Sequence, residues 1–557
     1  MKTIKLLLAA ALTLLMFSAC TSDGIEEDLD PMDEAEPDYL VMLYATGGGD
    51  LDANILQNVM QLLYEGSNSK VKYTVQYKLS ADEQEKYANE FGGVRRLTGT
   101  DNLALKSKSG KQPTLAKDYG QTLAAIKSER LAGRQYDVTT RQALADFVRW
   151  SKQKYPGAKR TILIINDHGS GWELDKDGKQ DAPTRAILFD DNTNMSYLTA
   201  GDVASGVKDA GGVDMIYTDA CLMSMYENLY AYADACKYLL TAVEKIPGQG
   251  GNYMHLLRLL KSAGNTEEGL EAAMHRYVDY CTSKEWWGRN QSAYADLGFY
   301  NLEKFRKACT PVLNKIAGTL AEKFQSRESI MPTTEELPFD EWFTAYIRVA
   351  VNRCMVTYAT AYIPSRTIAA FVPYLQKDGI KPDEDGDFLC RDLIEWSVYA
   401  LTDGAQEAYE DNPALFLKLQ RLVTTSSKRA FSLTDMLRVL CNELDAVGAQ
   451  NNPFTLLRAE LLAAIKSAAY LSCTKPDAKP AVDQEYELCS PAVFIAPLNE
   501  ALLSEDYPSY QKNIPTIEDG IRYYQGTAFD QQVGWSRFLQ VLDVVPDAVN
   551  PTRKYVK

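Results

Sequence analysis

Short apolar runs alternate with helical patterns along the first 300 residues of the chain. Tyr39–Ala45 is a continuous apolar run that ends in glycines, which is typical of a buried strand. Asp52–Tyr64 has apolar residues at helical spacing, and Val71–Leu79 alternates as a strand does. Thr140 can cap a helix that runs to Lys154, and a second apolar run, Thr161–Ile165, follows it.

The same alternation continues after residue 190. Leu198–Val207 is predicted to be a helix, Val213–Thr218 a strand, Ser224–Tyr232 a helix and Tyr238–Val243 a strand. Strands and helices in this order predict an α/β fold with a mostly parallel sheet and helices on both faces. In such sheets the chemistry lies at the carboxyl ends of the strands.

The pattern changes near residue 300, and a chain of 557 residues is expected to form more than one domain. We predict one α/β domain over residues 39–300 and a mostly helical region over residues 301–557. The predicted helices of that region cover 301–324, 340–357, 392–402, 413–422, 433–446 and 454–471. Ala492–Pro497 and Phe538–Val544 have the character of strands.

The N-terminus has the pattern of a targeting segment. Residues 1–20 combine two lysines, a short apolar core and small residues before Cys20, as in the signal peptide of a bacterial lipoprotein. Cys20 would then carry the lipid and anchor the protein to the cell envelope; an ordinary secretory signal is the alternative. Residues 21–38 hold nine carboxylates and no Lys or Arg, which predicts a solvated tether.

The composition narrows the range of partners. A net charge of −16 excludes a nucleic-acid-binding surface of the usual cationic kind and would attract a basic substrate. No CxxC occurs among the ten cysteines, and three histidines make no His-rich metal cluster. A Cys473–Cys489 disulfide is left open. Six other cysteines are predicted to be core thiols: Cys236, Cys281, Cys309, Cys354, Cys390 and Cys441.

Two apolar runs each end in a reactive residue, and these residues are 53 positions apart. His168 follows the run Thr161–Ile165, and Cys221 follows Val213–Thr218. Alone, such a His is more often a turn residue and such a Cys more often a core residue. As a pair at equivalent strand ends they predict the base and nucleophile of a cysteine peptidase. A helix beginning near Met223 would lower the thiol pKa.

Two backbone amides are candidates for an oxyanion hole. Gly169 has no side chain, so its N–H can approach a scissile carbonyl group, and the N–H of Cys221 can act with it.

The segments Asn166–Trp172 (NDHGSGW) and Thr218–Met225 (TDACLMSM) resemble the His and Cys boxes of the clostripain family of cysteine peptidases. The resemblance covers roughly residues 38–300. It implies a caspase-like fold and cleavage after Arg or Lys. It also implies that Asp219 pairs with the basic side chain of the substrate, although a carboxylate capping the following helix remains the alternative.

The resemblance further implies a zymogen that cleaves its own loop between His168 and Cys221. Arg185 is the predicted cleavage site, with Lys176 and Lys179 as alternatives. Glu244, the candidate for a second acid in the pocket, is followed at once by Lys245, which departs from a strict Arg pocket.

No organic or redox cofactor is expected. The resemblance makes calcium possible, and the candidate ligands are Asp175, Asp177, Asp181, Asp190 and Asp191. A solvated loop is the simpler interpretation of these acids, because their spacing is not that of an EF-hand. The sequence therefore predicts a lipid-anchored endopeptidase, and a binding lipoprotein that keeps the fold without the activity is the competing hypothesis.

Overall fold

The computed structural model describes a little over half of the chain. The described residues are 36–87, 92–99, 123–172 without 125, 187–243 without 194–195, 246–283, 286, 295–324, 430–446, 452–474, 486, 489–495, 522 and 524–541.

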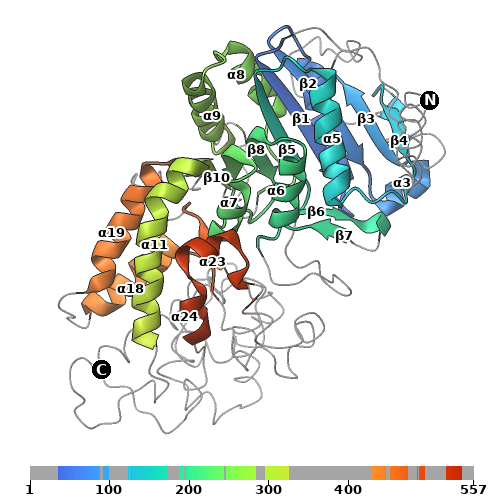
Figure 1. Ribbon diagram of the computed structural model, residues 1–557. Coiled ribbons are helices and arrows are strands. Elements are labelled where there is room, and N and C mark those ends of the chain that lie inside the picture. Colours follow the sequence, from blue (N-terminus) through green and yellow to red (C-terminus); the bar gives the residue numbers. More distant parts are fainter. Residues whose placement is uncertain are drawn as a thin grey trace, which may run out of the picture.

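A nine-stranded sheet forms the centre of the molecule (Figure 1). Its strands are β1 (Tyr39–Thr46), β2 (Val71–Lys78), β3 (Val94–Thr98), β4 (Glu129–Ala132), β5 (Arg160–Asn166), β8 (Val213–Asp219), β9 (Cys236–Thr241), β10 (Ala295–Asn301) and β12 (Ala469–Thr474). They lie in the order β12-β10-β9-β8-β5-β1-β2-β3-β4. The five strands from β9 to β2 are parallel to one another. At one edge β10 and β12 are added by antiparallel pairing, and at the other edge β3 and β4 are added in the same way. The predicted mostly parallel sheet is confirmed.

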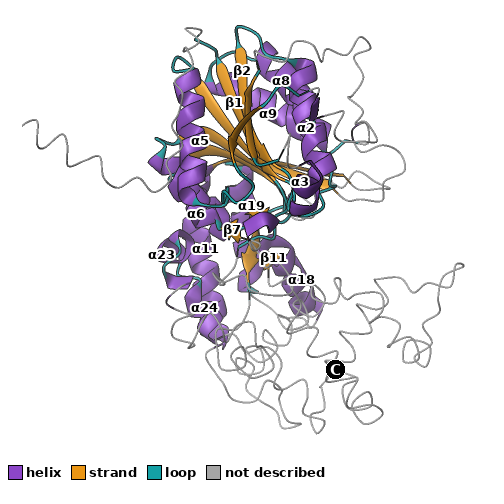
Figure 2. Ribbon diagram, turned by 90° about the vertical axis from the view of Figure 1, so that its right-hand side faces the viewer, coloured by secondary structure: helices purple, strands orange, loops and turns teal. Residues whose placement is uncertain are grey.

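Helices cover both faces of this sheet (Figure 2). On one face lie α2 (Asp52–Glu65), α8 (Tyr253–Ser262) and α9 (Glu267–Cys281); on the other lie α5 (Arg141–Lys154), α6 (Ala200–Asp209), α7 (Tyr226–Tyr232) and α11 (Leu302–Phe324).

Strand β1 shows why both faces must be covered. Alternate residues of a strand point to opposite faces, and in β1 both sets are apolar and buried. Val41 and Leu43 belong to the core with α2, whereas Leu40 and Met42 belong to the core with α5. The continuous apolar runs of the sequence thus correspond to strands buried on both sides.

Helix boundaries follow the predicted caps in one case and differ in others. Thr140 accepts a hydrogen bond from the Ala143 amide and caps α5, as predicted. The helix predicted from Leu198 begins instead at Ala200, because Thr199 forms a capping box with Asp202.

The C-terminal half contributes to the same sheet and core. β12 pairs with β10, and α18 (Leu433–Ala446) and α19 (Pro453–Lys466) share the core of α11. The helix predicted over 454–471 was therefore too long, since its last residues begin β12. The strand predicted from Phe538 was wrong: α24 (Ser536–Val541) is a helix that packs on α11. One sheet and one core thus extend across residue 300, where the sequence predicts a domain boundary.

Two further features bear on the sequence predictions. Cys473 and Cys489 form no disulfide, so the bridge left open above is absent. Among the helices of the described residues, none is long and apolar enough to cross a membrane.

Candidate active site

The two predicted boxes meet at the carboxyl edge of the sheet. β5 and β8 are parallel neighbours, and Asn166 pairs with Asp219 in their register. His168 and Cys221 each follow two residues later, so they leave the sheet at matched positions. A Cβ atom on Gly169 would lie 2.5 Å from the carbonyl oxygen and 3.0 Å from the nitrogen of Cys221. Only glycine allows the two backbones to approach so closely.

Cys221 lies in a turn between β8 and α7. Of the seven cysteines in the described residues, none of which forms a disulfide, it alone is not buried. Its Sγ is 3.7 Å from the carbonyl oxygen of Ile246. The next residue, Leu222, has a φ of 64°, a left-handed conformation that strains a bulky side chain and recurs at functional sites.

The predicted helix start near Met223 was wrong, because α7 begins at Tyr226 with Met225 at its N-cap. The turn places Cys221 five residues before the helix. A helix field at its thiol is therefore not the source of activation that the sequence suggested.

His168 has a partner that the sequence analysis did not identify. Its Nε2 atom lies 2.6 Å from Oδ1 of Asp50, in the glycine-rich loop that follows β1. This pair is open to solvent, with 40% of the His168 side chain and 78% of the Asp50 side chain exposed. A carboxylate in this place can fix the tautomer and orientation of an imidazole. The sequence contained one indication of this partner, namely an acidic residue soon after β1, the strand that pairs with β5.

Hydrogen bonds anchor the loop that carries Asp50 to the chain that follows β2. Asp52 accepts hydrogen bonds from the Ser80 amide at 2.8 Å and from the Ser80 hydroxyl at 2.5 Å. Burial raises the pKa of Asp52 to about 6. This anchor joins the β1 loop to the end of β2 and so limits the movement of Asp50.

Asp167, directly before His168, is buried and fully hydrogen-bonded. Its Oδ1 accepts from the His168 amide at 2.6 Å, and its Oδ2 accepts from the Phe189 amide at 2.5 Å. The Thr46 hydroxyl also contacts Oδ2 and lies 2.6 Å from the carbonyl oxygen of Phe189. Burial raises the pKa of Asp167 to about 8.

Asp219 is equally buried but has one free acceptor. Oδ2 accepts from the Tyr253 hydroxyl at 2.7 Å, the Gly251 amide at 2.8 Å and the Asn166 amide group at 3.2 Å. Oδ1 is buried without a partner. Burial raises the pKa of this carboxyl. Since it contacts the Gly250–Gly251 loop and not α7, the alternative of a helix cap is wrong.

The loop around Gly250 closes over Asp219. Gly250 has a φ of 61°, and a Cβ atom there would lie 2.6 Å from Asp219 Oδ2. The segment that carries this loop, Ile246–Gly251, therefore lies against the candidate pocket carboxylate. Glu244 and Lys245 lie outside the described residues.

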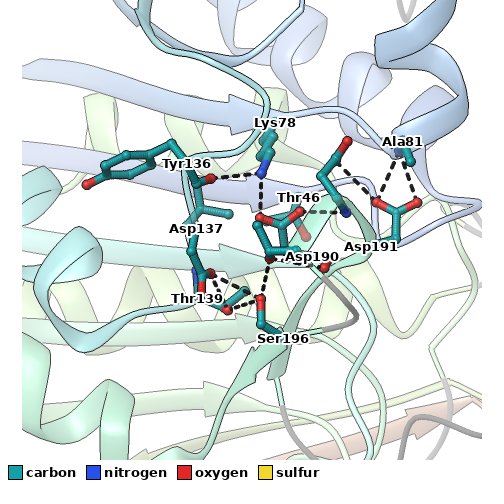
Figure 3. A network of polar contacts seen from close by, with 12 residues as sticks. Thr46, Lys78, Ala81, Tyr136, Asp137, Thr139, Asp190, Asp191 and Ser196 are labelled. Carbon is teal, nitrogen blue, oxygen red and sulfur yellow. Dashed lines mark hydrogen bonds and ion pairs between the residues drawn. The ribbon is translucent and has the colours of Figure 1, made fainter. Parts of the chain in front are cut away.

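A hairpin follows the predicted cleavage loop and is fastened to the sheet. β6 (Ile187–Asp190) and β7 (Ser196–Leu198) form this β6–β7 hairpin, and Ile187 bridges to Gly169. Asp190 forms a buried ion pair with Lys78 at 2.5 Å, and Lys78 also donates to the carbonyl oxygen of Tyr136 (Figure 3).

Other predicted site residues cannot be placed. Cys20, Lys176, Lys179 and Arg185 lie outside the described residues.

Two of the candidate calcium ligands already have protein partners. Asp190 pairs with Lys78, and Asp191 accepts from the Ala81 amide at 3.0 and 3.1 Å (Figure 3). The other three, Asp175, Asp177 and Asp181, lie outside the described residues. Within the described residues, no cluster of three or more His, Cys, Asp or Glu side chains could hold a metal ion.

Comparisons with known proteins agree with the two boxes. The sequence model of the clostripain family matches residues 93–362. Clostripain of Hathewaya histolytica is 23% identical over 250 residues, which are 38% of this chain and 47% of that protein. The match therefore spans about half of the length of that relative.

Two solved structures are similar over most of this chain. One is a secreted cysteine protease of Bacteroides thetaiotaomicron in complex with an irreversible peptide inhibitor, 12% identical, covering 90% of this chain and 99% of that chain with a TM-score of 0.45. The other is an inactive zymogen protease of Parabacteroides distasonis, 12% identical, with the same coverage and a TM-score of 0.43.

Proposed function

We propose that this chain, whose residues 93–362 match the model of the clostripain family, is a cysteine endopeptidase that cleaves after Arg or Lys. Cys221 is the nucleophile and His168 the general base. One observation carries the proposal. The register of β5 and β8 brings His168 and Cys221 to one sheet edge, where the backbones of Gly169 and Cys221 touch.

The reaction follows from these positions. His168 takes the proton of the Cys221 thiol, and the sulfur attacks the carbonyl carbon of the scissile bond. The amides of Gly169 and Cys221 donate to the developing oxyanion, at about 3 kcal/mol per donor in other enzymes. The tetrahedral adduct expels the amine, which takes the proton from His168, and leaves a thioester. Water, deprotonated by His168, then hydrolyses the thioester and restores the thiol.

Asp50 orients the base. Its carboxylate accepts a hydrogen bond from Nε2 of His168, which directs Nδ1 to the other side of the ring. When His168 becomes an imidazolium ion, the same carboxylate stabilises its charge. The exposure of the pair limits this contribution through screening by solvent.

Asp219 selects the basic side chain. Its Oδ1 is a buried acceptor without a partner, which is an unfavourable state unless a ligand supplies a donor. A guanidinium or ammonium group supplies that donor and keeps the carboxyl ionised.

Self-cleavage after Arg185 would convert the chain to its active form. The loop to be cut lies between Gly169–Trp172 and Ile187, so both of its attachment points adjoin the site. Lipidation at Cys20 would place the enzyme at the bacterial cell envelope, with residues 21–38 as its tether.

The test is cleavage of a peptide library by the full chain and by Cys221→Ala. We expect wild-type products to end in Arg or Lys and the variant to release none. Mass spectrometry should also find a new N-terminus at Ala186 in wild type only. Undiminished cleavage by Cys221→Ala would refute the dyad, and products without basic ends would refute the specificity. A folded wild-type protein that cleaves nothing would favour the inactive binding lipoprotein.

A further inference from the structure

Asp167 lies where three parts of the chain meet. It contacts Thr46 at the end of β1, the His168 amide after β5, and Phe189 in the β6–β7 hairpin. The hydrogen bonds of its carboxyl group go to the Thr46 hydroxyl and to the two backbone amides, not to the His168 ring or the Cys221 thiol. The carboxyl group links the chain next to His168 to Phe189 of the hairpin, 22 residues after Asp167.

If the Asp167 carboxyl group is ionised, its contacts contain fewer donor protons than acceptors. The Thr46 hydroxyl has one proton but two close acceptors, Asp167 Oδ2 and the Phe189 carbonyl oxygen. If Asp167 is charged, Thr46 can donate to only one of them, and a second short contact joins two acceptors.

A proton on Asp167 Oδ2 satisfies every group. The carboxyl O–H then donates to Thr46, and Thr46 donates to the carbonyl oxygen of Phe189. Oδ2 can still accept from the Phe189 amide, while Oδ1 accepts from the His168 amide. Each N–H and O–H has an acceptor, and each buried oxygen has a donor.

We infer that Asp167 is a positioning residue that keeps a proton at neutral pH and, through Thr46, fastens the β6–β7 hairpin to the backbone of His168 and Gly169. The effect on turnover rests on the proposed peptidase function, whereas the proton itself does not. The hairpin in turn holds Gly169 through its bridge to Ile187. Base and oxyanion donor are thus fixed by the segment that follows the cleavage loop.

The charges around Asp167 agree with a neutral carboxyl group. Asp190 in the hairpin disfavours a second negative charge, and its partner Lys78 is already neutralised by that ion pair. Asp50 faces the His168 ring on the other side of the loop. Burial, the largest cause, raises the pKa of Asp167 to about 8.

Infrared difference spectroscopy tests the proton without requiring activity. The spectrum of Cys221→Ala at pH 7 is compared with that of the same protein carrying Asp167→Ala. We expect the loss of a C=O band of a protonated carboxyl group. Loss of a carboxylate band instead would overturn the inference.

Thr46→Val keeps the test decisive if Asp167→Ala does not fold. This isosteric change removes the acceptor of the carboxyl proton, so the C=O band should move in frequency. An unmoved C=O band, or a change only among carboxylate bands, would overturn the inference.

Kinetics of Thr46→Val test the positioning role. The control is Thr74→Val, a buried threonine of β2 whose hydroxyl donates to Ser151 and touches no site residue. We expect kcat to fall about five- to tenfold for Thr46→Val, the value of one lost hydrogen bond, with KM within about twofold. Thr74→Val should leave both constants near the wild-type values. Equal effects of the two variants, or a change in KM alone, would contradict a positioning role.

Discussion

The ends of β5 and β8 each carry a buried carboxylate beside a reactive residue, but the two carboxylates differ in their hydrogen bonds. At the end of β5, both oxygens of Asp167 have partners, and these partners belong to the protein. At the end of β8, three donors converge on one oxygen of Asp219 and leave the other without a partner. A buried carboxylate whose two oxygens both have protein partners stabilises the fold. A buried carboxylate with one unpartnered oxygen can instead accept a hydrogen bond from a ligand.

Under the proposed function, we expect this difference to separate a side of the site that stabilises the fold from a side that binds the basic side chain of the substrate. The β5 side is fastened to the β6–β7 hairpin by Asp167 and by the Lys78–Asp190 ion pair. On the β8 side, the loop at Gly250 covers Asp219, whose Oδ1 atom has no hydrogen-bond partner. Variants on the first side should therefore lower stability, and variants on the second should lower the rate for basic substrates.

The largest effect is expected at Lys78. Lys78→Met leaves the buried Asp190 carboxylate without its partner and should lower the free energy of unfolding by about 3–5 kcal/mol. Denaturant unfolding measures this loss. Arg141→Met, which breaks the exposed pair with Asp209, is the control and should change stability far less. Similar losses of unfolding free energy in both variants would show that the buried ion pair stabilises the fold no more than the exposed one.

Asp219→Asn should mainly affect specificity. An amide cannot neutralise a bound guanidinium group, so kcat/KM for Arg and Lys peptides should fall by about 10² to 10³. The melting temperature should change little, because Asn can retain a hydrogen-bond acceptor. Asp214→Asn, at the opposite end of β8, is the matched control and should keep the wild-type rate. An unchanged preference for basic residues in Asp219→Asn would disprove the pocket.

Asp167, on the β5 side, should contribute to the pH dependence of stability. The pKa of Asp167 is about 8 in the folded state and near 3.8 in the unfolded state. The folded state therefore keeps a proton on Asp167 between these values, so the contribution of this group to stability is greatest below about pH 4 and is lost as the pH rises through about 8. Asp167→Ala should reduce this slope by at most about 1.4 kcal/mol per pH unit. An identical slope in the variant, measured by denaturant unfolding from pH 5 to 8, would contradict the shift.

A smaller effect than at Asp219 is expected at Asp50. Asp50→Asn should lower kcat about tenfold, because His168 loses an orienting carboxylate but keeps its place in the backbone. KM should change little, since the hydrogen bond of Asp50 goes to the His168 ring. High salt should reduce the difference between variant and wild type, as the pair is exposed. A loss in KM without a loss in kcat would assign Asp50 to substrate binding instead.

The parts of this site that could be predicted are those with a local pattern. Apolar runs ending in His168 and Cys221 identified two strands, and parallel strands bring their carboxyl ends together. Asp219 was predicted through the resemblance of its box. Its free oxygen was not predictable, because the donors on Oδ2 come from Asn166, Gly251 and Tyr253.

The parts that were missed depend on long-range contacts or on short apolar runs. Asp50 and Thr46 reach the site because β1 lies next to β5, and sequence spacing does not reveal this neighbour. Phe538–Val544 has a pattern that fits either a strand or a helix, and packing on α11 selects the helix. The start of α7 was misplaced because the turn at Leu222 has no glycine to mark it.

Labelling of Cys221 tests the central claim most directly. The folded wild-type chain is treated with a thiol-reactive peptidyl-arginine probe, and the modified peptide is identified by mass spectrometry. We predict one adduct, on Cys221, that is absent in His168→Ala and much slower to form with a peptidyl-aspartate probe. No adduct, or an adduct on another cysteine, would contradict a cysteine peptidase site at the shared edge of β5 and β8.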